Sequence, residues 1–192
     1  MTIDPRATLD LIWLIWLISW VAASFWSGRT QRRVGTVESW AYRAGMIAGG
    51  ILLVPWTARV LAEKRLWDVG DAGVYAFAGL QLAGLAFAWW ARIHLGRLWS
   101  SAITRKEDHR IIDDGPYGLV RHPIYTGLIT GLFATAAAEG TVTALIGSAL
   151  VIFGLWLKAR TEERFLMVEL GADDYAAYCR RVPMLLPFPH RR

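Results

Sequence analysis

Residues 124–157, "IYTGLITGLFATAAAEGTVTALIGSALVIFGLWL", contain two apolar runs, 124–138 and 141–157, divided by Glu139 and Gly140. Each run is long enough for about four helical turns. The charged and flexible pair between them predicts a tight turn, so the whole stretch is typical of a helical hairpin. A bilayer core about 30 Å thick needs roughly 20 helical residues. We therefore expect an all-α integral membrane protein in which these two short runs are spans.

Three further apolar segments lie upstream, at residues 9–26, 42–61 and 72–91. Within the second segment, Pro55 is expected to kink the helix without ending it, since membrane helices tolerate proline. Together with the hairpin these segments predict about five transmembrane helices. No strands are evident.

The overall composition supports a membrane location and limits the other functional classes. Apolar residues make up 55% of the 192-residue chain, and it contains 11 tryptophans, which favour the membrane–water boundary. Cys179 is the single cysteine, so neither an intrachain disulfide nor a cysteine-based zinc site can form. We expect a lipid bilayer as partner, no nucleic acid despite the net charge of +5, and no metal.

The basic residues predict the orientation of the spans. All but four of the 21 lysines and arginines lie in residues 28–43, in residues 92–121 or from Lys158 onward, which a five-span layout puts on one side. The positive-inside rule makes that side cytoplasmic and puts the N-terminus outside. No signal peptide is evident and the chain is short, which favours a prokaryotic inner membrane.

The segment just before the hairpin, "DDGPYGLVRHPIYTG" at residues 113–127, is unusually polar and stiff. Pro123 suits the first turn of the helix that follows, where a missing N–H costs nothing. The unpaired N–H groups expected there, with Arg121 and His122 beside them, would attract an anion. The structural alternative is a basic interfacial loop with an ordinary histidine.

The segment after the hairpin, residues 158–181, carries Glu162 and Glu163 one turn past the expected membrane exit. Its apolar residues recur at helical spacing, which favours an amphipathic helix along the lipid headgroups. The proline-rich end from Val182 onward is expected to pack, as an extended cap, over this polar region or over the membrane surface.

The stretch "GPYGLVRHPIYTG" resembles the pattern G-P-Y-x-x-x-R-H-P-x-Y-x-G of the isoprenylcysteine carboxyl methyltransferase family and the related membrane phospholipid methyltransferases. The resemblance extends upstream through "LGRLWS" and "EDHRII" and downstream through "RTEE" and "DDYAAYCRRVPMLLPF", covering about residues 95–188. It implies a polytopic enzyme that binds S-adenosylmethionine on the cytoplasmic side. The resemblance also implies that the methyl acceptor is a hydrophobic molecule with a carboxylate, such as a prenylated cysteine.

The resemblance also assigns candidate cofactor residues by motif position. One wall of the pocket would comprise His109, Gly115, Pro116, Tyr117, Arg121, His122, Pro123, Tyr125 and Gly127, and Glu162 and Glu163 on the tail helix would form the other. We expect one domain over residues 1–192, with three spans in 1–91 and the cofactor-binding region in 92–192.

A carboxylate acceptor is already ionised at neutral pH, so the enzyme would mainly align the two reactants. Arg121 and Arg160 are the catalytic candidates for holding that carboxylate. Arg121 could instead bind the cofactor's carboxylate, and Arg160 could bind headgroups. An amine acceptor would need a base such as Glu163 or His109.

Three other functions remain open on the sequence alone. A phospholipid N-methyltransferase has the same motif, and sterol-type reductases carry a similar His-Pro-x-Tyr-x-Gly region that binds NADPH. A non-enzymatic protein could bind lipid through the basic loop. The oligomeric state is also open.

Overall fold

The structure, a computed structural model, describes residues 4–25, 30–33, 36–96, 99, 104–106 and 111–187. Its helices and strands follow in the order α1 (Arg6–Ser24), β1 (Thr30–Arg33), α2 (Thr36–Leu53), α3 (Pro55–Val60), α4 (Gly70–Leu95), β2 (Thr104–Lys106), α5 (Pro116–Leu119), α6 (Pro123–Glu139), α7 (Val142–Leu170) and α8 (Ala172–Arg181). Among the described residues, α1, α4 and most of α7 are long and apolar enough to cross a membrane. The predicted helical, membrane-embedded class is therefore confirmed.

The predicted hairpin is formed by α6 and α7. Gly140 ends α6 in the left-handed conformation, with φ 62° and ψ 25°. Only glycine adopts this conformation without strain, and a Cβ at this position would also meet the Trp67 carbonyl oxygen. The Thr141 side chain then accepts a hydrogen bond from the Ala144 N–H at 3.2 Å and caps α7. The turn is thus specified by both of its residues.

The expectation that Pro55 only kinks its helix is wrong. α2 ends at Leu53, and Pro55 occupies the first turn of the separate short helix α3. Val54 between them is extended, with φ −67° and ψ 126°. A residue before proline is pushed out of the helical region by the proline ring, which explains the break.

The expected boundary between the last span and the tail helix is also wrong. α7 runs without interruption for 29 residues, so Glu162 and Glu163 lie on the spanning helix itself. At 1.5 Å per residue it is about 44 Å long, and its last turns extend beyond a bilayer core. The chain reverses only at Gly171, which has φ 95° and precedes the amphipathic helix α8.

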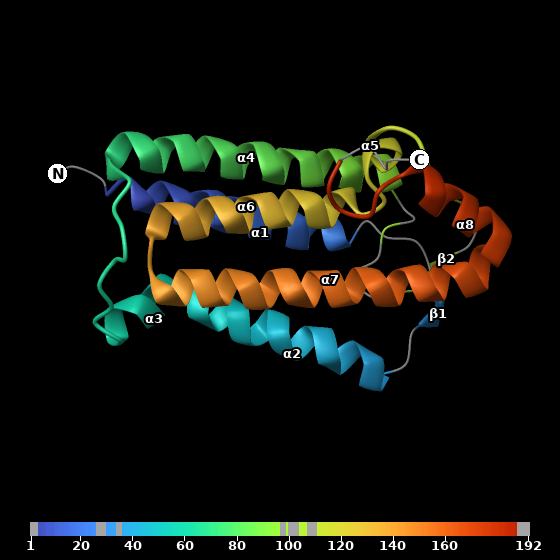
Figure 1. Cartoon of the computed structure of the whole chain (residues 1–192), viewed down its shortest axis with the longest axis horizontal. Helices are drawn as coiled ribbons and strands as arrows, with labels where there is room; N and C mark the ends of the chain where they lie inside the picture. The colour runs from blue at the N-terminus through green and yellow to red at the C-terminus, as the bar shows by residue number, and fades with distance from the viewer. Residues whose placement is uncertain are drawn as a thin grey trace.

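Two closely packed helix pairs form the bundle, α4 with α6 and α2 with α7 (Figure 1). Glycines face each other in both pairs. A Cβ at Gly84 would lie 2.7 Å from the Gly127 carbonyl oxygen, and one at Gly147 would lie 2.9 Å from that of Gly49. Small residues allow membrane helices to approach this closely. Gly49 therefore serves packing within the chain.

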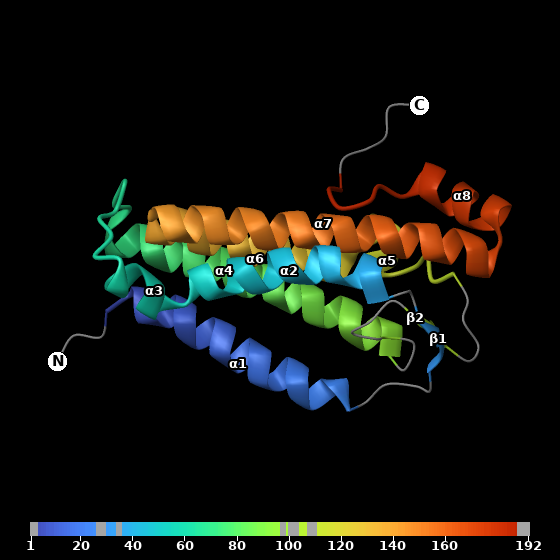
Figure 2. The ribbon, with the colours of Figure 1, turned by 90° about the horizontal axis from the view of Figure 1, so that it is seen from below.

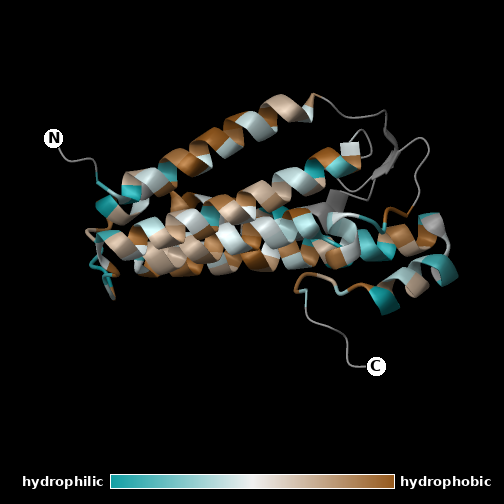
Figure 3. Cartoon of the chain, turned by 90° about the horizontal axis from the view of Figure 1, so that it is seen from above, coloured by the Kyte–Doolittle hydropathy of each residue, from teal (hydrophilic) through white to brown (hydrophobic). Residues whose placement is uncertain are grey.

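Helix α1 runs alongside α4 but tilts away from the bundle towards its C-terminal end (Figures 2 and 3). A ladder of aromatic rings connects it to the bundle: Trp16 stacks on Trp20, and Trp20 meets Trp89 and Trp99 edge to face. Trp16 and Trp20 of α1 thus make contacts inside the molecule.

The sequence showed no strands, but the structure has a small ladder. β1 pairs antiparallel with β2, with Thr30 opposite Lys106, and joins the connections that follow α1 and α4. Figure 1 shows this ladder, α5 and α8 at one end of the molecule, here called the α8 end. The opposite end, with α3, residues 61–69 and the α6–α7 turn, is called the hairpin end.

Candidate functional site

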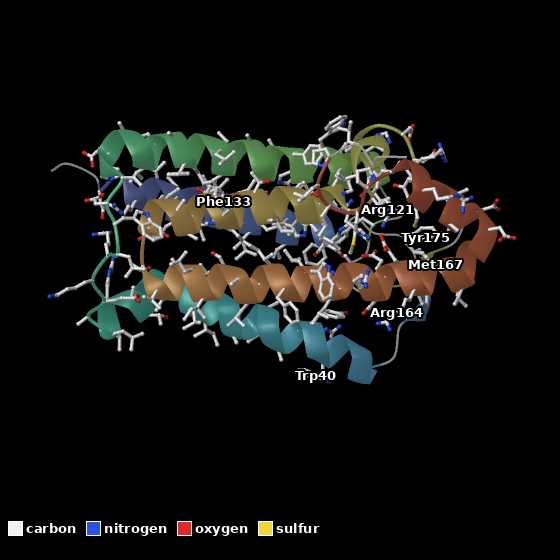
Figure 4. All side chains as sticks on the ribbon, in the orientation of Figure 1. Trp40, Arg121, Phe133, Arg164, Met167 and Tyr175 are labelled. Carbon is white, nitrogen blue, oxygen red and sulfur yellow. The ribbon has the colours of Figure 1, made fainter. Side chains whose placement is uncertain are left out.

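At the α8 end a buried ion pair joins the motif segment to α7. Arg121 Nε donates to Glu163 Oε1 at 2.7 Å, and the two side chains are only 10% and 11% exposed. His122 Nε2 lies 3.3 Å from the same oxygen. Arg121 and His122, which the sequence assigned to one wall of the cofactor pocket, thus contact Glu163, which it assigned to the other wall. Figure 4 shows Arg121 at this end, near Tyr175 of α8.

The chain after α8 folds back over the start of α6. Arg121 Nη1 donates to the carbonyl oxygens of Cys179 at 3.0 Å and Val182 at 2.6 Å. The backbone N–H groups of Arg121 and His122 donate to Pro183 and Met184 at 2.8 and 3.1 Å. The predicted cap is confirmed for the described residues. The tail carbonyls therefore take the two backbone N–H groups just before α6, while the anion site predicted from the sequence concerns the N–H groups of the first turn of α6 itself.

Tyr125 and Glu162 form a second contact between α6 and α7. The tyrosine hydroxyl donates to Glu162 Oε2 at 2.7 Å, and its ring stacks on His122, with centroids 5.3 Å apart and planes 5° apart. The Glu162 side chain is 30% exposed, against 11% for Glu163. Of the two carboxylates, Glu162 is therefore the one that a ligand can reach.

The turn before α5 packs against the end of α4. Gly115 has φ 54°, and a Cβ there would meet the His94 ring at 2.7 Å. His94 stacks on Tyr117 and has its Nε2 2.9 Å from Asp114 Oδ1. Tyr117 is buried, and this burial raises the pKa of its phenol. The Gly115–Tyr117 segment is thus held in place by the His94 ring, which lies against Gly115 and stacks on Tyr117.

The remaining candidate residues lie in different surroundings. Pro123 occupies the first turn of α6, as predicted, and is buried. Gly127 faces Gly84 of α4 at the helix crossing. Arg160 is exposed, and its guanidinium lies over the Trp156 ring at 5.3 Å, so the structure does not bring it to Glu162. His109 lies outside the described residues.

Sequence reasoning missed several residues around this cluster. His94 occupies the last turn of α4, and a histidine that ends an apolar run is a signal that could have been used. The Lys158 ammonium lies over the Tyr125 ring at 5.3 Å. Lys158 is also the first charge after the uncharged residues 142–157, another usable signal. The contacts of Cys179 and Val182 use only backbone carbonyls, which no side-chain pattern marks.

The chemistry of this cluster favours a cationic ligand. A partly exposed carboxylate beside stacked aromatic rings offers both charge pairing and a π face. Arg121, by contrast, donates from Nε to Glu163 and from Nη1 to the tail carbonyls. The cluster therefore suits a positively charged group near Glu162 better than an anion near Arg121.

Comparisons with known proteins agree with the motif. The Cobalt-zinc-cadmium resistance protein CzcN of Cupriavidus metallidurans is 35% identical over 98 residues, which are 48% of this chain and 43% of that protein. The Protein-S-isoprenylcysteine O-methyltransferase of Schizosaccharomyces pombe is 28% identical over 99 residues, 50% of this chain and 42% of that protein. The Methanethiol S-methyltransferase of Mycobacterium tuberculosis is 41% identical over 76 residues, 39% of this chain and 30% of that protein.

The chain thus spans less than half the length of these three relatives. The family model for the isoprenylcysteine carboxyl methyltransferase (ICMT) family matches residues 76–168, which include α5, α6 and the two glutamates of α7. Over this stretch, just under half of its length, the chain is similar to the isoprenylcysteine carboxyl methyltransferase family.

Proposed function

We propose that the protein is an S-adenosylmethionine-dependent methyltransferase that acts on a hydrophobic acceptor in the membrane. One observation carries the proposal. The motif residues of the family-matched segment converge on the α7 glutamates through the Arg121–Glu163, His122–Glu163 and Tyr125–Glu162 contacts. Residues far apart in the sequence thus form one polar cluster at the end of an otherwise apolar bundle.

The described residues fit the cationic parts of this cofactor. Glu162 would hold its positive sulfur or its ribose, while Gly115, Pro116 and Tyr117 would form the adjoining wall. Arg121 and His122 would act indirectly, by fixing the Glu163 carboxylate and the tail. The bound cofactor supplies a methyl group on a positively charged sulfur, whose electron pair stays with the neutral thioether after transfer.

For the acceptor we propose a carboxylate on a hydrophobic group, such as that of an S-prenylated cysteine. An ionised carboxylate attacks without a base, and Glu163, the candidate base among the described residues, is already paired with Arg121 and His122. Named relatives include enzymes for isoprenylcysteine and for methanethiol, so a small thiol is the main competing acceptor. A phospholipid amine would require loss of a proton first.

We also propose that α1, α2, α4, α6 and α7 all cross the membrane, with the N-terminus outside and the α8 end in the cytoplasm of a prokaryotic cell. α6 has 17 residues, about 26 Å of helix, which is slightly short for a bilayer core. Its close packing on α4 supports a transmembrane position, and the positive-inside rule supports the orientation.

Titration of the purified protein with S-adenosylmethionine and with NADPH tests the enzyme class. We expect S-adenosylmethionine to bind, and Glu162→Gln to weaken that binding at least tenfold. Asp174→Asn, an exposed change on α8, is the matched control and should leave the affinity unaltered. Binding of NADPH alone would favour a reductase, and binding of neither would favour a lipid-binding protein.

Transfer of a labelled methyl group from the cofactor tests the acceptor. Prenylcysteines, methanethiol and phospholipid vesicles are offered in parallel to the same preparation. We expect label in a base-labile ester of the prenylcysteine. Label only in the thiol or only in the phospholipid would contradict the proposed carboxylate acceptor and leave the enzyme class intact.

A further inference from the structure

Lys158 marks the point at which α7 passes from apolar to charged sequence. The sixteen residues before it, 142–157, carry no charge. The Lys158 side chain is half-buried, and its ammonium lies over the ring of Tyr125, on the first turns of α6. It is therefore a cation directed into the bundle at the border of the apolar segment.

Helix α2 approaches α7 one turn before Lys158. A Cβ at Gly154 would lie 2.6 Å from the Met46 side chain and 2.9 Å from the Tyr42 carbonyl oxygen. Tyr42 itself is buried. Lys158 is thus placed where α2, α6 and α7 meet.

Glu162 follows Lys158 by four residues, so both occupy the same face of α7 about 6 Å apart along its axis. From the centre of the bundle towards the α8 end, the order along this face is apolar residues, then Lys158, then Glu162. A molecule that enters from the hydrocarbon therefore meets the cation before it reaches the carboxylate.

We propose that Lys158 binds the ionised carboxylate of the membrane acceptor and positions it next to Glu162. This inference rests on the proposed methyltransferase function. A carboxylate at membrane depth is costly unless it has a counter-ion, and Lys158 is a cation at that border. An ammonium is a compact point charge that can bind one carboxylate oxygen and leave the other to attack, whereas arginine tends to hold both.

Arg160 provides the internal contrast. It is two residues along the same helix, but it is exposed and stacks on Trp156, which is itself 38% exposed. Its guanidinium therefore belongs to the outer surface of α7. The role that the sequence assigned to Arg160 passes to Lys158, and Arg160 becomes the matched control.

The test measures binding without turnover, in the presence of S-adenosylhomocysteine. The probes are N-acetyl-S-farnesylcysteine and its neutral carboxamide. We expect the wild-type protein to bind the acid at least tenfold more tightly than the amide. Lys158→Met should abolish this preference by weakening only the acid, Lys158→Arg should restore part of it, and Arg160→Met should preserve it.

The outcomes separate the inference from the function on which it rests. Failure of the wild-type protein to bind S-adenosylhomocysteine would defeat the proposed function. If the wild-type protein binds S-adenosylhomocysteine but binds the acid no more tightly than the amide, only the role of Lys158 is overturned. This outcome can be measured on the wild-type protein, without any variant. The role of Lys158 would also be overturned if Lys158→Met weakened the binding of the acid, the amide and S-adenosylhomocysteine equally. Lys158 would then only support Glu162.

In turnover, Lys158→Met should raise KM for the acid far more than it lowers kcat. A residue that merely maintains the fold would not produce that selective change. The melting temperature of each variant, measured in the same detergent, identifies any change that reflects unfolding.

Discussion

The two ends of the bundle both carry ion pairs with exposed partners, but the α8 end also has a pair in which both partners are buried. At the α8 end Arg121 and Glu163 are 10% and 11% exposed, whereas at the hairpin end Arg6 pairs with an Asp68 that is 65% exposed. Taking both charges of a pair out of water is expensive, so a buried pair is weak evidence for a purely stabilising role. This difference is what we expect if the α8 end holds the proposed site and the hairpin end only closes turns.

The largest effect expected is from breaking the buried pair. Arg121→Ala leaves the Glu163 carboxylate with His122 alone and releases the carbonyls of Cys179 and Val182. Loss of one partner of a buried pair costs about 3–5 kcal/mol. We expect a large drop in melting temperature and loss of cofactor binding. Arg6→Ala, at the hairpin end, is the control and should cause a small drop with normal binding.

The reactivity of Cys179 can show whether the tail detaches when the Arg121–Glu163 pair is broken. Cys179 is the only cysteine, and burial raises the pKa of its thiol, which lowers its thiolate fraction at neutral pH. Arg121 itself lowers this pKa, so Arg121→Ala should speed maleimide labelling only because the thiol becomes exposed as the tail detaches. Unchanged labelling would show that the tail docks without Arg121.

Each end of the bundle has a glycine with positive φ, Gly115 at the α8 end and Gly140 at the hairpin end. Gly115→Ala and Gly140→Ala both place a Cβ in a disfavoured conformation and against a neighbour, the His94 ring or the Trp67 carbonyl. Strain of this kind costs about 1–3 kcal/mol. We expect both variants to lose stability by similar amounts in thermal melts.

Only Gly115→Ala should also weaken cofactor binding, because that turn forms the proposed wall. Gly50→Ala is a control for the substitution itself, since no described atom outside its own stretch of helix lies within 4 Å of where its Cβ would stand. Equal loss of binding in Gly140→Ala would break the distinction between the ends.

The sequence was sufficient for the parts of the fold that rest on local chemistry. The α6–α7 turn followed from Glu139-Gly140, and the start of α6 from Pro123. The end of α2 was missed because Pro55 was judged by membrane tolerance, although its effect on Val54 decided the result. The length of α7 was missed because charged residues were taken to end a helix that in fact extends past the apolar region.

The sequence was enough to name the residues of the candidate site, but it was not enough to predict their contacts. The motif and "RTEE" nominated Arg121 and Glu163 separately, and no spacing within the chain indicates that they pair across 42 residues. Arg160 and Lys158 differ by two positions, and that spacing places them on different sides of a helix. Only the orientation of α7 against α6 determines which one faces Tyr125.

Single hydroxyl groups offer a finer comparison. Tyr125→Phe removes the hydrogen bond to Glu162, and Thr143→Val at the hairpin end removes the one to Glu63, at 2.7 and 2.6 Å. A hydrogen bond to a charged group contributes about 1.5 kcal/mol. Thermal melts should show a comparable loss in both. Isothermal titration with the cofactor should show weaker binding for Tyr125→Phe alone, and weakening by Thr143→Val would contradict the division of roles.

The smallest effect expected is at Asp68, where only the pH dependence of stability should reveal the contact. Hydrogen bonds from the Gly70 N–H and from Arg6 hold the pKa of this exposed carboxyl below its usual value. Since the folded pKa is below the unfolded one, the ionised carboxylate contributes stability above the usual range for aspartate, and this is lost as pH falls through the folded pKa. Asp68→Asn should therefore flatten the acid side of a plot of melting temperature against pH, with cofactor affinity at neutral pH unaltered. If Asp68→Asn lowered the affinity for the cofactor, the hairpin end would influence the proposed site. That result would contradict the separate roles of the two ends.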